Sequence, residues 1–176
     1  LPIFAREREE GTFDQLLVAP YTPGEILLGK GTASVITGII QAVFVVLVAM
    51  FWFRIPFQGS IWLLSAALLL FIVTAAAIGL CISSFAQSLQ QAIVGTFLLL
   101  VPMVMLSGFA TPISSMPEIF QSLTLLNPMR YGLELIQRIF LEGASFLDLW
   151  PLFAAIMAVT VVAVLAAVFS FHHKIS

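Results

Sequence analysis

One stretch of the chain has the spacing of a phosphate-binding loop. Gly24 is followed by four residues and then by Gly29 and Lys30, in PGEILLGKGT. In such a loop, backbone amides and the lysine hold the phosphates, and a Ser or Thr directly after the lysine holds magnesium. Here Gly31 takes the Ser/Thr position, and the residues between the glycines are Glu25 and three aliphatic helix formers. The pattern therefore predicts a helix entering a membrane, with Lys30 at the interface, rather than a nucleotide site.

The other groups that could do chemistry are few. His172 and His173 lie beside Lys174 without a third ligand nearby, so no metal site is expected. Cys81 is the single cysteine and cannot form an intrachain disulfide. Proton- or sodium-coupled transporters usually keep ionisable groups within the membrane, and we expect none there. The sequence therefore predicts no catalytic residue and no cofactor bound by this chain.

The composition is that of a membrane protein. Hydrophobic residues make up 61% and charged residues 9%, with a mean hydropathy of +1.12, against about 45–50% and 25% in soluble domains. No Asp, Glu, Lys, Arg or His occurs from Ile55 through Pro117, which leaves room for more than one crossing of about 20 residues. These runs do not alternate between apolar and polar residues, so helices are predicted rather than a barrel. The net charge of −2, without a basic block, argues against a nucleic-acid partner.

We predict an all-α, polytopic membrane helical bundle that forms a single transmembrane domain over residues 1–176. About four spans are expected, at residues 23–53 (with the membrane part from about 32), 61–84, 91–108 and 147–170. Residues 54–59 and 85–91 should be short turns, and 111–145 an external helical segment. An even number of spans places both ends on one side. Four basic residues on that side, against three on the other, weakly favour cytoplasmic ends.

Two short helices are predicted in the external segment. Ser115 and Glu118 can form a capping box around Pro117, and Asn127 followed by Pro128 can start a second helix. In the second helix, charges of alternating sign recur every four residues, at Arg130, Glu134, Arg138 and Glu142. Each ion pair would contribute about 0.2–0.5 kcal/mol, too little to define a site. A helix lying in the interface or re-entering against protein is therefore expected.

A few polar side chains are predicted at membrane depth. They are Gln41, Thr74, Thr96, Ser107 and Thr160. Some of them are candidates for lining a pathway, but hydrogen bonds between packed helices explain them equally well. Ala75, Gly79 and Ser83 repeat every four residues and would form a flat ridge for close approach of another helix.

The segment before the first span is predicted to contain a short helix within residues 6–20. Thr12 and Gln15 have the spacing of a capping box. Phe13 and Leu16 fall on one apolar face, and a proline ends the run. Such a helix would lie along the membrane surface.

The stretch REREEGTFDQLLVAPYTPGEILLGK resembles the signature segment of permease subunits of bacterial type-2 ABC exporters. In that family an E-R/K-E-x-G-T-x-x-x-L-x-x-x-P pattern follows the second of six membrane helices. The stretch LSGFATPISSMPEIFQSLTLLNPMRY is similar to the family's outer signature between its fifth and sixth helices. Together the two stretches bracket nearly the whole chain, which looks most like the multidrug-type branch. The family's first two helices have no counterpart here, so we expect the C-terminal half of a longer chain.

The resemblance implies that ATP is used by a partner. In such exporters two permease subunits, identical or different, form the path, and each rests a coupling helix in a groove of an ABC ATPase subunit that binds ATP and magnesium. The implied contact residues here are Arg6, Glu7, Arg8, Glu9, Gly11, Thr12, Phe13 and Leu16. Apolar side chains would fill the groove and charged ones would set orientation. The resemblance also implies a multi-pass protein of the bacterial cytoplasmic (inner) membrane, surrounded by lipid bilayer, with both ends of this segment cytoplasmic.

The sequence leaves the cargo open. The multidrug branch suggests a drug-like or lipophilic compound, but a lipid-linked glycan or a peptide could also pass between apolar walls. A non-transporting membrane scaffold or assembly subunit is an alternative of a different class. An autonomous channel would need a polar-lined pore, for which these spans supply few residues.

Overall fold

The computed structural model describes residues 23–86 and 88–172, so the predicted contact segment within residues 6–20 lies outside the described residues. The described residues form helices joined by turns, without a β-strand, which confirms the predicted all-α class. In chain order the helices are α3 (Pro23–Leu47), η1 (Val48–Trp52), α4 (Ile61–Phe85), α5 (Leu89–Met105), η2 (Ile113–Ser115), α6 (Glu118–Leu123), η3 (Thr124–Leu126), α7 (Pro128–Gln137), η4 (Arg138–Glu142) and α8 (Phe146–His172).

Three helices in the described part of the chain are long and apolar enough to cross a membrane. They run over Leu28–Trp52, Ile61–Phe85 and Phe146–Ser170, with 25 residues each. Each is about 38 Å long, more than the roughly 30 Å of a hydrocarbon core. The helix predicted at residues 91–108 is α5, which has 17 residues, begins at Leu89 and ends at Met105. At about 26 Å it is shorter than the core.

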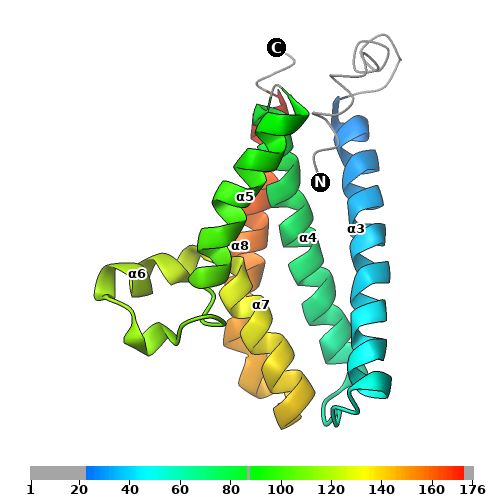
Figure 1. The fold of residues 1–176 in the computed structure, drawn as a ribbon. Coiled ribbons are helices and arrows are strands. Elements are labelled where there is room, and N and C mark those ends of the chain that lie inside the picture. Colours follow the sequence, from blue (N-terminus) through cyan, green and yellow to red (C-terminus); the bar gives the residue numbers. More distant parts are fainter. Residues whose placement is uncertain (1–22, 87, 173–176) are drawn as a thin grey trace.

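The described start of α3 and end of α8 lie at one end of the bundle, and the turn between α3 and α4 lies at the other (Figure 1). The turn expected over residues 85–91 is shorter than predicted, because α4 continues to Phe85 and α5 begins at Leu89. Ser88 caps α5 by accepting a hydrogen bond from the Gln91 amide at 3.2 Å. This cap explains why the predicted turn residues after Ser88 are helical.

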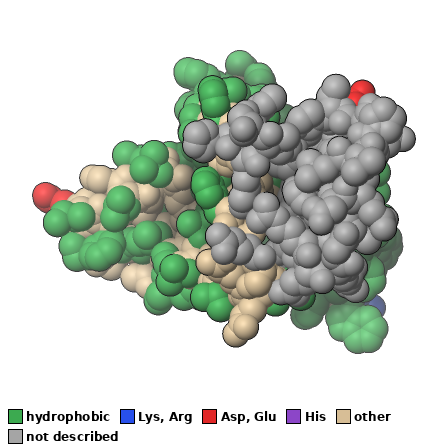
Figure 2. All heavy atoms as spheres, turned by 90° about the horizontal axis from the view of Figure 1, so that it is seen from above, with side chains coloured by type: hydrophobic (Ala, Val, Ile, Leu, Met, Phe, Trp, Pro, Cys, Tyr) green, Lys and Arg blue, Asp and Glu red, His purple; other side chains and the backbone are tan. Residues whose placement is uncertain are grey.

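The outer surface of the bundle is apolar. Phe44 of α3, Leu98 of α5 and Val162 of α8 are exposed over 67%, 75% and 66% of their surface. Seen along the bundle, hydrophobic side chains cover much of the visible described surface (Figure 2). So large an apolar surface marks a membrane or protein contact, and here it matches the spanning lengths of the helices.

The tightest packing lies where α7 and η4 meet α4 and α8. Leu135, Ile139, Leu149 and Ile156 are completely buried, and Leu64 is 2% exposed. These side chains belong to one apolar cluster. Because α7 is only ten residues long, its position depends on this packing rather than on its own helix stability.

A buried hydroxyl pair joins α4 to α8. Thr74 and Thr160 are 0% and 6% exposed, and their Oγ1 atoms are 2.6 Å apart. Each hydroxyl also lies 2.7 Å from a carbonyl oxygen of its own helix, at Leu70 and Ile156. Two hydroxyl protons thus serve three short contacts, so one threonine donates across the helices at any moment. Thr74, a candidate pathway residue in the sequence, has a packing role in this structure.

Replacing Thr74 by Val is expected to lower the free energy of unfolding by about 1 kcal/mol, within the range measured for hydrogen bonds between membrane helices. The effect stays modest because Thr160 can still donate to its own helix. Unfolding in mixed micelles of increasing SDS content would measure the loss. Thr37→Val is the matched control, since the Thr37 hydroxyl bonds only to Ala33 of its own helix. An equal loss in both variants would contradict a cross-helix role for Thr74.

The segment after α5 re-enters the bundle. Asn127 caps α7 by accepting from the Met129 amide at 3.0 Å, which confirms the predicted helix start. Its Nδ2 donates to the Met103 carbonyl at 2.7 Å and so ties α7 to the end of α5. The predicted capping box before α6 is wrong. Ser115 belongs to η2, and Pro117 occupies the cap position, where no side chain bonds.

Glycine contacts fix the direction of α7 along α4. A Cβ added at Gly132 would lie 2.5 Å from the ring of Phe71, in the middle of α4. A Cβ added at Gly59, just before α4, would lie 2.0 Å from the carbonyl oxygen of Ile139. The segment from α7 into η4 therefore runs antiparallel to α4, from its midpoint to its start (Figure 1).

Candidate functional site

A large cleft lies between α3 and α4, with η4 contributing to its wall. Its volume is about 820 Å³, within the roughly 300–1,000 Å³ typical of small-molecule sites. Most of its lining is apolar and includes Val45, Val46, Leu68, Ile72 and Phe140. Such a cavity suits a lipophilic molecule.

Gly38 sets how closely the two walls approach. A Cβ added at Gly38 would lie 2.6 Å from Cγ2 of Ile72, so α3 and α4 are in direct contact there. Both residues also line the cleft. A small residue at this point lets the helices touch while larger neighbours hold them apart, which leaves the cleft beside the contact.

Three polar side chains of α3 line the cleft. Ser34 donates to the Lys30 carbonyl at 3.0 Å, and Thr37 donates to the Ala33 carbonyl at 2.9 Å, so both hydroxyls are engaged within the helix. The Gln41 side chain makes no hydrogen bond to any described residue. Its carboxamide is the polar group that the cleft offers to a molecule inside it.

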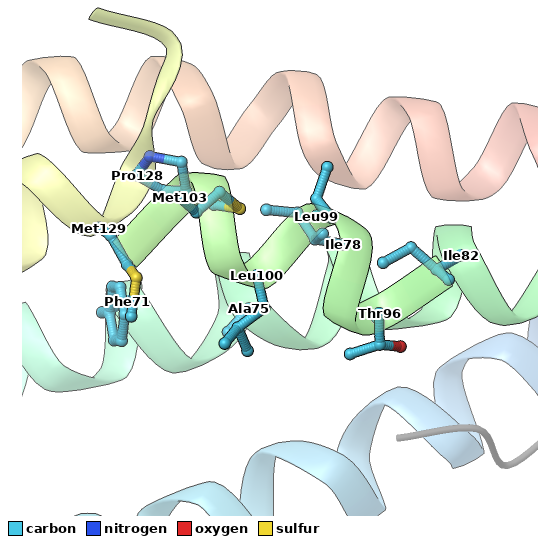
Figure 3. A pocket seen from close by; sticks show the side chains of 11 residues that line it. Phe71, Ala75, Ile78, Ile82, Thr96, Leu99, Leu100, Met103, Pro128 and Met129 are labelled. Atoms are coloured by element: carbon cyan, nitrogen blue, oxygen red, sulfur yellow. The ribbon is translucent and has the colours of Figure 1, made fainter. Parts of the chain in front are cut away.

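A second, smaller cavity lies between α4, α5 and the start of α7 (Figure 3). Its volume is about 130 Å³. Ala75 and Gly79, two members of the predicted ridge, line it opposite Leu99 and Leu100 of α5. The ridge therefore faces another helix as predicted, but side chains leave a gap between them. Thr96 also lines this cavity, and its hydroxyl donates to the Ala92 carbonyl at 2.8 Å.

Of the five polar residues predicted at membrane depth, the structure brings together only Thr74 and Thr160. Gln41 lines the large cleft, Thr96 lines the smaller cavity, and Thr74 is buried against Thr160. Ser107 lies after the end of α5, where its hydroxyl donates to the Val104 carbonyl at 2.7 Å. Of the five, Gln41 alone both faces a cavity of ligand size and has a side chain that bonds to no described residue.

The predicted ladder of charges along α7 forms only in part. Glu134 and Arg138 pair at 2.9 Å, and no described ion pair includes Arg130 or Glu142. The chain widens into a π-helical turn over Arg138–Glu142, which breaks the spacing of four that the ladder needs. The ladder prediction is therefore wrong beyond its central pair.

The described geometry also bears on nucleotide and metal binding. Gly24 through Gly31 lie within α3, so they form a helix and not a phosphate-binding loop. No group of three or more His, Cys, Asp or Glu side chains that could hold a metal ion occurs among residues 23–86 and 88–172. The residues predicted to contact an ATPase, from Arg6 to Leu16, lie outside the described part of the chain.

A family model described as "ABC-2 type transporter" matches residues 2–141. The chain belongs to this family. Two relatives from Escherichia coli K12 are named as permeases. "Probable multidrug ABC transporter permease YbhR" is 35% identical over 171 residues, covering 97% of this chain and 46% of that protein. "Inner membrane transport permease YhhJ" is 37% identical over 157 residues, covering 88% and 41%.

A third relative, "Nodulation protein J" from Sinorhizobium fredii, is 31% identical over 147 residues, or 79% of this chain and 53% of that protein. No solved structure matches the chain. The chain spans about half the length of the curated relatives that it matches. The chain thus belongs to the ABC-2 type transporter family, and its described residues include three helices long and apolar enough for a multi-pass membrane protein, as its sequence predicted.

Proposed function

We propose that the chain forms part of the translocation path of an ATP-driven exporter and couples to a separate ABC ATPase subunit. The observation that carries this proposal is the apolar cleft of about 820 Å³ between α3 and α4. Its volume and lining fit a drug-like or lipophilic cargo. The multidrug names of relatives such as YbhR agree with that cargo class.

Packing supports a division into a fixed and a moving part. Only 6% of an 18-residue apolar stretch of the first spanning helix is buried, against 28% of the corresponding stretch of α4. The Thr74–Thr160 bond holds α4 to α8. Because α3 has less buried surface to lose, it is the helix that a force from outside would displace. Movement of α3 against α4 would change the volume of the cleft.

The proposed force comes from a partner. α3 begins at Pro23, shortly after the predicted ATPase contact segment within residues 6–20. A partner that binds ATP and magnesium and pulls on that segment would pass its motion directly to α3. We place the chain in the bacterial inner membrane with both of its ends cytoplasmic, beside a second permease subunit.

Within the cleft, Gln41 is proposed to orient the cargo. An unengaged carboxamide in an apolar span is costly in hydrocarbon, because its donors and acceptor need partners. A hydrogen-bonding group on the cargo would supply one. A cargo with one polar group on an apolar body would thus match the cleft.

The test uses the native permease reconstituted with its ATPase subunit in liposomes. We expect the lipophilic dye Nile red to stimulate ATP hydrolysis. We expect Gln41→Leu to raise the dye concentration for half-maximal stimulation by about threefold to tenfold, as loss of one hydrogen bond predicts. Ile40→Leu is the matched control, since Ile40 is 65% exposed and lies outside the cleft lining.

The outcomes separate two claims. If Gln41→Leu behaves like the wild type while the dye still stimulates, the cleft assignment fails and the export proposal survives. If neither Nile red nor any other lipophilic compound stimulates hydrolysis or is exported, the result would favour the alternative of a non-transporting scaffold subunit. Stimulation by a lipid-linked glycan alone would change the cargo class.

A further inference from the structure

A polar pocket of about 200 Å³ lies between α7 and the connection from α5 to α6. Ser107 and Phe109 line it from the connection, and Arg130, Glu134 and Gln137 line it from α7. It shares no lining residue with the α3–α4 cleft. The pocket is therefore a separate site.

Arg130 lies deep in the bundle for a charged residue. Gly132, half a turn further along α7, contacts Phe71 near the midpoint of α4. Asn127, just before α7, is bonded to the end of α5. These two contacts place Arg130 level with the middle of a spanning helix, where the sequence predicted no ionisable group. A charge at such a depth is costly unless a partner or water compensates it.

The protein compensates Arg130 only in part. Its Nη1 donates to Thr124 Oγ1, and its buried Nε has no acceptor in the described part of the chain. No described carboxylate pairs with Arg130, because Glu134, one turn away, pairs with Arg138 at 2.9 Å. Thr124 is neutral and already donates to the Gln121 carbonyl at 2.7 Å. The guanidinium thus has no counterion among the described residues.

The rest of the lining defines which ligand fits. Ser107 is engaged on both sides, since it donates to Val104 and accepts from the Phe109 amide at 3.3 Å. The Gln137 side chain makes no hydrogen bond within the described residues and adds an amide donor to the pocket lining. Phe109 is 73% exposed and forms an apolar edge. The pocket therefore combines a cation and an amide with an apolar margin.

We propose that this pocket binds a phosphate group, with Arg130 as its cation, carried either by an anionic membrane phospholipid or by a free phosphate ion. Arginine favours phosphate because its planar N–H groups can donate two parallel hydrogen bonds to two oxygens. The apolar edge at Phe109 favours the phospholipid, whose acyl chains would lie against it. This site is independent of the export proposal, because binding requires neither cargo nor ATP.

The test measures lipid and phosphate binding by the full-length permease in nanodiscs. In phosphatidylcholine nanodiscs with added phosphatidylglycerol, native mass spectrometry would count the anionic lipids that stay bound. Arg130→Gln is expected to lower retention at least about tenfold, the factor for one charge-assisted contact. Glu134→Gln is expected to raise retention, because it removes the negative charge lining the pocket. The second arm titrates inorganic phosphate into nanodiscs of phosphatidylcholine alone.

Arg54→Gln is the matched control, because Arg54 is exposed in the turn between α3 and α4 and lies outside the pocket. Retention that depends on Arg130 in the lipid arm alone assigns the site to phospholipid, and in the phosphate arm alone to the free ion. Arg130-independent binding in both arms would overturn the proposal, as would an equal loss in Arg54→Gln. Opposite shifts in Arg130→Gln and Glu134→Gln exclude misfolding as the cause.

Discussion

Replacing Gly59 by Ala is expected to destabilise the purified permease by at least about 3 kcal/mol, the upper end of usual overpacking penalties. The added Cβ would lie 2.0 Å from the carbonyl oxygen of Ile139 and 2.9 Å from its carbonyl carbon. Both atoms belong to the backbone, so no side-chain rotation can relieve the clash. The turn before α4 would have to move away from η4.

That movement would disturb further contacts. The Gln58 amide donates to the Phe140 carbonyl at 3.2 Å, and Phe57 packs edge-on against the Phe140 ring at a centroid distance of 5.1 Å. Gly143, with a φ of 64°, also lies close to this turn, because a Cβ added there would be 2.8 Å from the Gln58 carbonyl oxygen. The backbone of the turn and the backbone of η4 and Gly143 are thus in close contact at two points. One added methyl group, at Gly59, would force the two segments apart.

The melting temperature in detergent would measure the effect. Gly29→Ala is the matched control, because a Cβ added there meets nothing within 4 Å and alanine favours the helix by about 0.5–1 kcal/mol. We expect Gly29→Ala to melt at or above the wild-type temperature and Gly59→Ala to melt well below it. Equal melting temperatures for the two variants would show that the turn does not pack against η4 as described.

The sequence predicts the spanning helices well because length and apolarity decide them. Every backbone N–H and C=O in a bilayer must be paired within its own segment, so an uncharged run such as Ile61–Phe85 has no alternative to a helix. Some helix caps can also be predicted from the local sequence. Asn127 before Pro128 predicts the start of α7, and the structure places it there. The sequence also places the cleft residue Gln41 correctly within the first spanning helix.

Long-range pairings could not be predicted from one sequence. Thr74 and Thr160 are 86 positions apart, and nothing local to either residue indicates the other. The last step of the charge ladder fails because a π-helical turn, which no residue pattern announces, changes the spacing after Arg138. The first step fails because Arg130 bonds to Thr124 while Glu134 pairs with Arg138. The depth of Arg130 depends on Gly132 meeting Phe71, a contact between elements far apart in the chain. The threonine pair and the depth of Arg130 are tertiary contacts, whereas the π-helical turn is a local change in the backbone.

Two substitutions in the proposed coupling segment would test how the permease docks on its ATPase subunit. Replacing Phe13 and Leu16 together by Asp is expected to abolish ATPase stimulation by cargo while leaving the permease in the membrane. The two residues share the apolar face of the predicted helix within residues 6–20. If that face fills a groove of the ATPase, two carboxylates would have to be buried there without partners, which costs far more than a docking contact supplies.

Insertion should survive, because the spanning helices between Leu28 and Ser170 are unchanged. Co-purification of the ATPase subunit with the permease would measure docking, and ATP hydrolysis with and without Nile red would measure coupling. Gln15→Asp is the matched control, since it adds the same carboxylate off the apolar face of the predicted helix. Normal docking by the double variant would refute a role for this face. Loss of docking in Gln15→Asp as well would show that added charge, rather than the lost apolar face, separates the subunits.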